Sequence, residues 1–299
     1  MEQAANQVTG NSAILAPGGT SHATPRKKWS RGTSLATWIT IAILMILAGA
    51  FFLYLLVPLA ALLLHAPPSE IWHQMQQPDV IAALKLSLVT TTISTVLGVI
   101  FGLPAAILLA RTSFPGHRFL EVLATIPTVL PPTVAGLALL LTYGRTGLVG
   151  KYLNILGIQI PFTTTAVVMA QIFVAAPFFV NTAKSGLEQL HSRYETAAYT
   201  LRASPFQAFR YVVLPLVSPA LLTAVGLAWA RALGEFGATI TFAGNFPGVT
   251  QTLPIAVYIA SQTNLDKSIA VSVILLAVSF AVLLTLGLAR TLLSRKWSI

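Results

Sequence analysis

Two oppositely charged residues, Arg231 and Glu235, stand at the end of an apolar stretch and are four residues apart. A helix places residues at this separation on one face, so we expect the guanidinium and the carboxylate to lie side by side. Charged side chains at membrane depth either neutralise one another or act on a charged solute that crosses the hydrocarbon. The spacing leaves both roles open.

Hydroxyl side chains in two other apolar stretches form a second set of candidate groups. A hydroxyl can hydrogen-bond a solute in a pathway, or it can bond the carbonyl group of the preceding turn of its own helix. The candidates are Thr91, Thr92, Ser94, Thr128 and Thr133. We expect the second, structural role for most of them.

Motifs of enzyme active sites are missing from the sequence. It has no His-Glu-x-x-His pair and no Gly-x-Ser-x-Gly, and Gly150-Lys151-Tyr152 lacks the spacing and the hydroxyl of a nucleotide-binding loop. The five histidines lack ligand spacing, and without cysteine there is no disulfide and no thiolate metal site. We therefore predict that this polypeptide is not an enzyme, has no cofactor or metal site and binds no ATP itself.

The elements that position these groups are membrane helices. The chain has 299 residues, of which 55% are hydrophobic and only 9% charged, whereas a soluble domain carries about 25% charged residues. Six apolar stretches are long enough to cross about 30 Å of hydrocarbon. They are residues 36–64, 83–110, 119–142, 163–183, 212–233 and 269–293. We expect an all-α polytopic protein of about six transmembrane helices.

Proline and basic residues refine this picture. Pro127, Pro131 and Pro132 are expected to interrupt the third helix. Of the 18 basic residues, 13 fall on the side of the N-terminal segment, which places both chain ends in the cytoplasm and argues against a nucleic-acid patch. Residues 1–34 lack apolar periodicity and are expected to be a disordered cytoplasmic tail, with residues 35–299 forming the transmembrane domain.

A polar segment, residues 184–211, separates two of the apolar stretches. It carries too many charges to cross a membrane, yet its alanines favour helix and Ser204-Pro205 can begin a second helix. We expect two short surface helices around a bend. Ala197, Ala198 and Leu201 recur at helical spacing and give a small apolar face that a soluble partner can grip.

This polar segment resembles the cytoplasmic EAA loop of permease subunits in ATP-binding-cassette importers. The family pattern is Glu-Ala-Ala, three residues, Gly, nine residues and Ile-x-Leu-Pro. Here Thr196, Arg202 and Val212 stand in place of the Glu, the Gly and the Ile. The residues that match are Ala197, Ala198, Leu214 and Pro215. The spacing is intact, and Ala203-Ser204-Pro205 is expected to supply the turn that the missing glycine would otherwise make.

Three further segments are similar to the molybdate and tungstate branch of these permeases, to which sulfate and thiosulfate permeases are related. They are residues 231–239, which include the Gly234-Glu235-Phe236-Gly237 stretch, and residues 242–245 and 250–254. Residues 127–136 of the third span also resemble this group of oxyanion permeases. The resemblance implies a permease subunit of an importer for a tetrahedral oxyanion, with molybdate or tungstate favoured and sulfate or thiosulfate as the alternative. A channel or scaffold without an ATPase is the competing class.

The resemblance also implies partners and a location. They are a dimer of cytoplasmic ATPases that binds ATP and Mg²⁺, a second permease copy, an extracytoplasmic oxyanion-binding protein and the lipid of a bacterial or archaeal plasma membrane. The residues expected to contact the ATPase are Glu195, Ala197, Ala198, Leu201, Arg202 and Pro205. Pro215 is expected to keep these coupling helices distinct from the fifth span.

Overall fold

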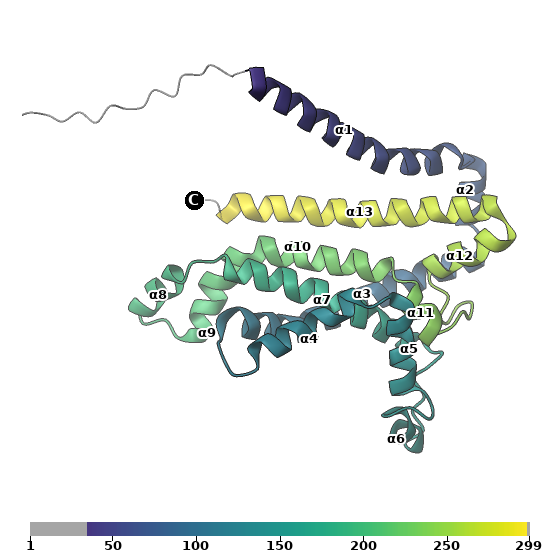
Figure 1. The fold of residues 1–299 in the computed structure, drawn as a ribbon. Helices are drawn as coiled ribbons and strands as arrows, with labels where there is room; N and C mark the ends of the chain where they lie inside the picture. The colour runs from purple at the N-terminus through teal and green to yellow at the C-terminus, as the bar shows by residue number, and fades with distance from the viewer. Residues whose placement is uncertain (1–34, 298–299) are drawn as a thin grey trace, which may run out of the picture. The chain divides into compact units, whose positions relative to one another are not determined.

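The computed structural model describes residues 35–297, so the expected tail, residues 1–34, lies outside it. The chain divides into two compact units, Met1–Leu55 and Leu56–Ile299. In the first unit the described residues form the N-terminal part of helix α1 (Leu35–Leu64), and Thr37–Leu64 is long and apolar enough to cross a membrane. Figure 1 shows the ribbon.

The described residues of the second unit, which also holds the end of α1, form helices joined by loops and turns, with no strand among them (Figure 1). Its further helices are α2 (Pro68–Met75), α3 (Pro78–Arg111), α4 (His117–Val129), α5 (Pro132–Tyr143), α6 (Gly150–Ile155), α7 (Thr164–Glu188), α8 (Arg193–Thr200), α9 (Pro205–Ala208), the π-helical turn η1 (Phe209–Val213), α10 (Leu214–Leu233), α11 (Gly237–Phe242), α12 (Leu253–Thr263) and α13 (Leu265–Trp297). The all-α prediction is confirmed.

The predicted spans correspond to five long apolar helices and one bent pair. The bent pair is α4 and α5, which meet at an angle of 114° and replace the third predicted span. Leu130 lies in the break and is extended, as a residue before a proline prefers. The predicted interruption is therefore confirmed at Pro131 and Pro132, whereas Pro127 remains inside α4.

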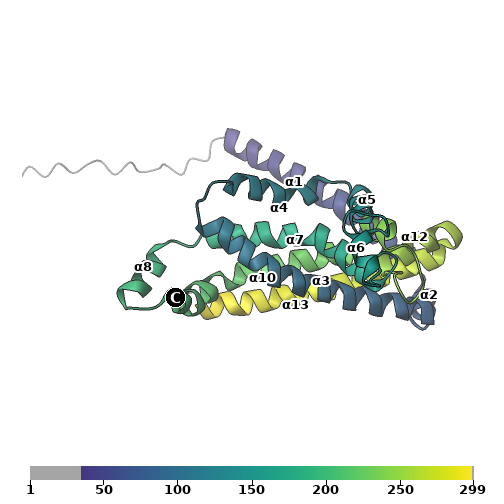
Figure 2. The same ribbon diagram turned by 90° about the horizontal axis from the view of Figure 1, so that it is seen from below.

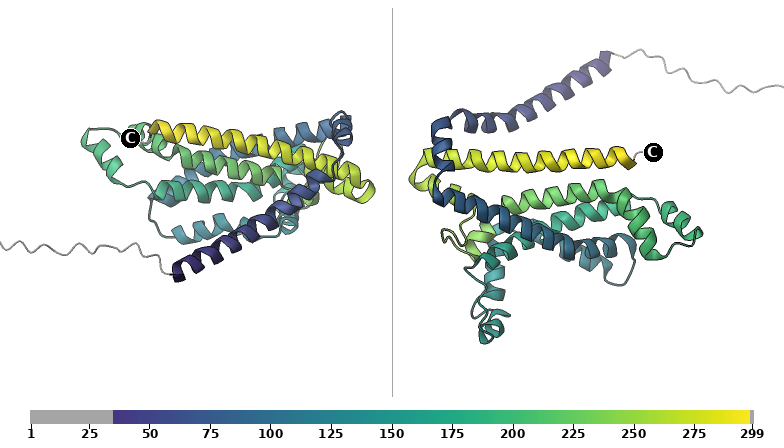
Figure 3. Two further views of the ribbon diagram at one scale, coloured as in Figure 1. Left: turned by 90° about the horizontal axis from the view of Figure 1, so that it is seen from above. Right: turned by 180° about the vertical axis from the view of Figure 1, so that it is seen from behind.

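The centre of the second unit is formed by α3, α7 and α10, which run side by side (Figures 1 and 2). Close approach of α3 and α7 depends on small residues. A Cβ atom on Gly102 would lie 2.9 Å from Phe179, and one on Gly98 would lie 3.9 Å from Ala176. Helix α13 runs along α10 (Figure 3).

A second cluster joins the broken span to the rest of the bundle. Ala135 and Leu139 of α5 are buried against α7 and against Ala238 and Phe242 of α11. A Cβ atom on Gly136 would come within 2.7 Å of the carbonyl oxygen of Ala238, so only glycine permits this approach. The chain is thus anchored directly after the α4–α5 break.

Candidate functional site

The polar segment forms two short helices, α8 and α9, at one end of the long helices (Figures 1 and 2). The two helices expected from the sequence are therefore present. Glu195 of α8 forms an ion pair with Arg111, the last residue of α3, at 3.0 Å between Oε1 and Nη2. Both side chains are 23% exposed, so the pair is largely shielded from water.

The bend between α8 and α9 is built around Arg202, whose φ is +63°. The Arg202 amide donates to the Tyr199 carbonyl at 2.9 Å, and the Ala203 amide donates to the Ala198 carbonyl at 3.1 Å. These two bonds form the helix cap that usually has glycine at the left-handed position. Arg202 thus adopts the conformation of the glycine it replaces in the family pattern.

Helix α9 then begins with a capping box at Ser204. The Gln207 amide donates to Ser204 Oγ at 3.3 Å, and the Ser204 amide donates to Gln207 Oε1 at 2.8 Å. The expected turn at Ala203-Ser204-Pro205 is therefore present, although it begins one residue earlier, at Arg202.

The expected separation of the short helices from the fifth span at Pro215 is wrong. Residues Pro205–Leu233 form one continuous helix, in which α9 passes through η1 into α10. The Leu214 amide donates to the Phe209 carbonyl, five residues back, across the wide turn of η1. We attribute the continuity to this turn, because its extra residue makes room for the Pro215 ring, which lacks an N–H and crowds the preceding turn of a regular helix.

An open groove of about 660 Å³ lies between α8, the bend and η1. Its walls are Tyr194, Ala197, Ala198, Leu201, Arg202, Ala203, Gln207, Tyr211 and Val212. Leu201 is 85% exposed, an unusual position for a large aliphatic side chain unless a partner covers it. Four of the six predicted contact residues line this groove. The other two do not, because Glu195 is paired with Arg111 and Pro205 begins α9 on the exposed side.

Arg231 and Glu235 lie side by side, with 2.7 Å between Nη1 and Oε2. The Glu235 side chain is 1% exposed, and its other oxygen accepts a hydrogen bond from the Ala238 amide at 2.8 Å. The carboxylate therefore neutralises Arg231 and also satisfies a free backbone N–H at the start of α11. The Arg231 side chain is 27% exposed, so it is partly accessible to solvent.

The predicted hydroxyl groups do not gather around one channel. Ser94 donates to the Thr91 carbonyl at 2.9 Å and Thr128 to the Thr125 carbonyl at 2.8 Å, as the structural role requires. Thr91 is buried and its hydroxyl accepts from Gln171 of α7 at 3.4 Å. Thr92 and Thr133 are exposed, the first on α3 and the second at the start of α5.

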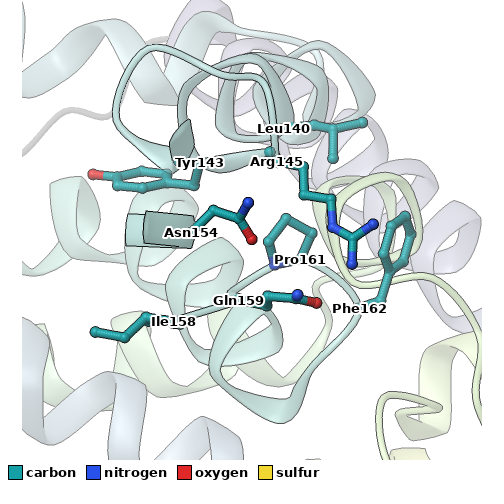
Figure 4. A pocket seen from close by; sticks show the side chains of 10 residues that line it. Leu140, Tyr143, Arg145, Asn154, Ile158, Gln159, Pro161 and Phe162 are labelled. Atoms are coloured by element: carbon teal, nitrogen blue, oxygen red, sulfur yellow. The ribbon is translucent and has the colours of Figure 1, made fainter. Parts of the chain in front are cut away.

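A pocket of about 310 Å³ at the opposite end of the long helices was not expected from the sequence (Figure 4). Arg145 follows α5, Asn154 belongs to α6, and Gln159 lies in the loop before α7. In Figure 4 the polar ends of these three side chains point into the same space. No motif connects them, so the only signal in the sequence was a basic residue between two apolar stretches.

Comparison with known protein families identifies the family to which this helical architecture belongs. Residues 98–298 match the model of the family described as binding-protein-dependent transport system inner membrane component. The chain belongs to this family. The match covers α4 to α13 and therefore includes the groove, the Arg231–Glu235 pair and the Arg145 pocket. The protein is thus an ABC transporter permease subunit with several membrane-spanning helices.

Two similar proteins illustrate the relationship. The permease is 42% identical over 259 residues to the molybdenum transport system permease protein ModB of Mycobacterium tuberculosis, covering 87% of this chain and 96% of the relative. It is 35% identical over 248 residues to the sulfate transport system permease protein CysT of Salmonella typhimurium, covering 82% and 90%.

A solved structure shares the fold at low sequence identity. The permease superposes with a TM-score of 0.69 and 14% identity on a chain of a bacterial ABC transporter involved in the import of the acidic polysaccharide alginate. The similarity covers 88% of this chain and 97% of that chain. At this identity the match supports the fold and carries no information on the substrate.

Proposed function

We propose that this permease is the membrane-spanning subunit of an ATP-driven importer for a tetrahedral oxyanion, with molybdate or tungstate as the cargo. The observation that carries the substrate class is the 42% identity to a molybdenum transport permease over nearly the whole chain. The similarity to a sulfate permease makes sulfate or thiosulfate the alternative cargo. Selection among these anions belongs mainly to the protein that delivers them.

The groove beside α8 is proposed as the contact surface for a cytoplasmic ATPase, which binds ATP and Mg²⁺ and supplies the energy. Ala197, Leu201 and Arg202 offer a small apolar surface with one charge, and the bend that shapes it is fixed by two backbone hydrogen bonds. A rigid, partly apolar projection of this kind is suited to a soluble partner. Ala198 is 8% exposed and supports the surface from below.

The orientation proposed here places α8, α9 and both chain ends in the cytoplasm. The basic residues support it, because Arg111, Arg118 and Lys184 lie at the same end of the long helices as α8. Residues 1–34 would then be a cytoplasmic tail. The Arg145 pocket would face the extracytoplasmic side of a bacterial or archaeal plasma membrane.

A second permease copy is proposed to complete the pathway. Helix α4 has an exposed apolar face on which Val122 is 59% and Val129 is 81% exposed, and a groove of about 520 Å³ runs along it. Thr92 and Thr133, which are exposed, are the proposed pathway hydroxyls. Thr91, Ser94 and Thr128 are proposed only as structural groups, because they form hydrogen bonds within or between the helices. Arg231, whose side chain is still partly accessible, is proposed to attract the anion. Its pairing with Glu235 reduces the net positive charge of the site, so that the anion can be released.

The test is ATP hydrolysis by the permease reconstituted with its ATPase and binding protein, titrated separately with molybdate, tungstate and sulfate. Selective stimulation by molybdate or tungstate is expected. Stimulation by sulfate alone would show that sulfate or thiosulfate, rather than molybdate or tungstate, is the cargo. No response to any of the three anions would reject the proposal of an oxyanion importer. An ATPase that never associates would favour a channel or a scaffold.

The contact surface is tested with two variants that add the same charge. Ala197→Glu places a carboxylate in the groove and should abolish capture of the ATPase. Thr196→Glu is the matched control, because Thr196 is an exposed neighbour that does not line the groove and the family pattern has Glu at this position. Equal loss of capture in both variants would reject the groove as the contact surface.

A further inference from the structure

The Arg145 pocket has the composition of an anion receptor. Its polar side chains are the guanidinium of Arg145, the amides of Asn154 and Gln159 and the phenol of Tyr143, and no carboxylate is among its ten lining residues. In the part of the chain that the structure describes, Arg145 forms no ion pair, and no hydrogen bond involves the side chain of Asn154 or Gln159. These donors are therefore available to a ligand.

The charge of Arg145 is also not compensated by its surroundings in the sequence. No acidic residue occurs between Glu121 and Glu188, and residues 236–265, which include α11 and α12, contain none either. At the same end of the long helices Asp79 is paired with Lys267 at 2.7 Å and Glu235 with Arg231. Two further carboxylates there, Glu70 and Asp266, do not line the pocket, and Glu70 accepts a hydrogen bond from Gln74. An uncompensated guanidinium beside two amide groups favours an oxyanion, which accepts two parallel hydrogen bonds from arginine.

The turn that carries Arg145 is rigid. After α5 the chain folds back so that the Leu148 amide donates to the Leu141 carbonyl at 3.1 Å and the Val149 amide donates to the Thr142 carbonyl at 2.8 Å. A Cβ atom on Gly150 would overlap the carbonyl oxygen of Gly144, so this approach requires glycine. Arg145 is thus held by a turn that a side chain at position 150 would break.

The opposite wall is fixed by a strained residue. Phe162 has φ of +63°, a region that non-glycine residues rarely occupy, and its ring packs edge to face on Phe246 with 6.1 Å between centroids. Strain of this kind persists only where the surrounding structure enforces it, and it clusters at binding sites. Both walls of the pocket are therefore preorganised before any ligand arrives, which lowers the entropic cost of binding.

We propose that this pocket binds an oxyanion group on the extracytoplasmic face, with Arg145 supplying the charge and Asn154 and Gln159 donating hydrogen bonds. The inference rests on the proposed function for its orientation. Two sources can provide the group, namely the free tetrahedral oxyanion and a carboxylate side chain of the protein that delivers it. The pocket volume of about 310 Å³ accommodates either one.

The experiment uses the complete permease and ATPase complex in lipid nanodiscs with Arg145→Gln and Lys151→Gln. Lys151 is the matched control, because it lies on α6 close to the pocket, stacks on Tyr152 and does not line the cavity. Two affinities are measured for each variant. One is that of radiolabelled molybdate without the binding protein, and the other is that of the loaded binding protein.

Arg145→Gln should weaken either the affinity for free molybdate or the affinity for the loaded binding protein by about tenfold or more, which is the usual loss for a charge-assisted hydrogen bond. Lys151→Gln should change both affinities less than about threefold. Loss of free molybdate binding identifies the oxyanion as the ligand. Loss confined to the binding protein identifies a carboxylate of that protein. Equal effects of the two variants, or none, would overturn the proposal.

Asn154→Asp provides an independent test should Arg145→Gln impair assembly. The substitution keeps the size of the side chain and places a negative charge in the pocket, so it should weaken the same affinity about tenfold. Unchanged or tighter binding would contradict an anion site. Failure of the proposed function has a different signature, since the unaltered complex would then hydrolyse ATP without responding to any oxyanion.

Discussion

The guanidinium of Arg111 and the carboxylate of Glu195 lie 3.0 Å apart and connect the last residue of α3 to the first turn of α8. Helix α8 is therefore attached to the bundle at three points, through this ion pair and through the chain that joins it to α7 on one side and to α9 on the other. Movement of α8 by a bound partner must displace α3 or break the pair.

Glu195→Gln should reduce substrate-stimulated ATP hydrolysis about three- to tenfold, because a partly shielded ion pair contributes about 1 kcal/mol. The measurement is the stimulated rate in proteoliposomes. Glu188→Gln is the control, since Glu188 pairs with Lys184 within α7 and is more exposed, and it should change the rate less than about twofold. An equal reduction in both variants would contradict a specific role for the α3–α8 connection.

Two substitutions at Arg202 should change the stability of the α8–α9 bend in opposite directions. Arg202→Gly removes the cost of the left-handed conformation and should stabilise the bend, by up to about 1 kcal/mol, whereas Arg202→Val should destabilise it by at least that amount. Limited proteolysis within residues 193–210 reports the local stability. Greater protection by valine than by glycine would show that the positive φ is absent in the assembled protein.

Gly102→Ala should destabilise the protein by about 1–3 kcal/mol, because the new methyl group would lie 2.9 Å from Phe179 and 3.1 Å from Val180 of α7. Gly98→Ala, one helical turn away, meets only Ala176 at 3.9 Å and should be tolerated. Thermal unfolding in detergent distinguishes the two. Similar melting temperatures for both variants would exclude close α3–α7 packing at Gly102.

The Arg231–Glu235 pair is tested by a double-mutant cycle. Arg231→Gln leaves a buried carboxylate without its cation and should cost about 3 kcal/mol or more, whereas the double variant Arg231→Gln with Glu235→Gln should recover much of this loss. Melting temperature measures stability, and stimulated ATP hydrolysis measures function. If the double variant is stable but its ATP hydrolysis is no longer stimulated by oxyanions, the pair also acts in the pathway. If its ATP hydrolysis is stimulated normally, the pair has only a structural role.

The long helices could be predicted from the sequence because hydrocarbon imposes a length and a composition on every span. The break near Pro131 was equally predictable, since a proline cannot donate to a helical ladder. The short helices α2, α6, α11 and α12 were missed because they lack the length and periodicity that identify a span. Continuity through Pro215 was missed because a π-helical turn has no sequence signature.

The candidate site was only partly predictable. Ala197 and Leu201 follow helical spacing, so their shared surface could be expected, whereas the diversion of Glu195 to Arg111 depends on the three-dimensional position of the end of α3. The left-handed conformation of Arg202 contradicts the usual preference of arginine and could be inferred only from the family pattern. The Arg145 pocket brings together residues from three segments, a juxtaposition that no local pattern encodes.

The continuous helix from Pro205 to Leu233 contains 29 residues, which corresponds to about 43 Å at 1.5 Å per residue. It begins beside the groove, passes through the π-helical turn η1 and Pro219, and ends just before Gly234. An axial push at α9 would be carried along this helix to the Gly234–Gly237 corner, which surrounds the buried carboxylate of Glu235. In the proposed orientation, a partner at the groove would therefore act on the other side of the membrane through one helix.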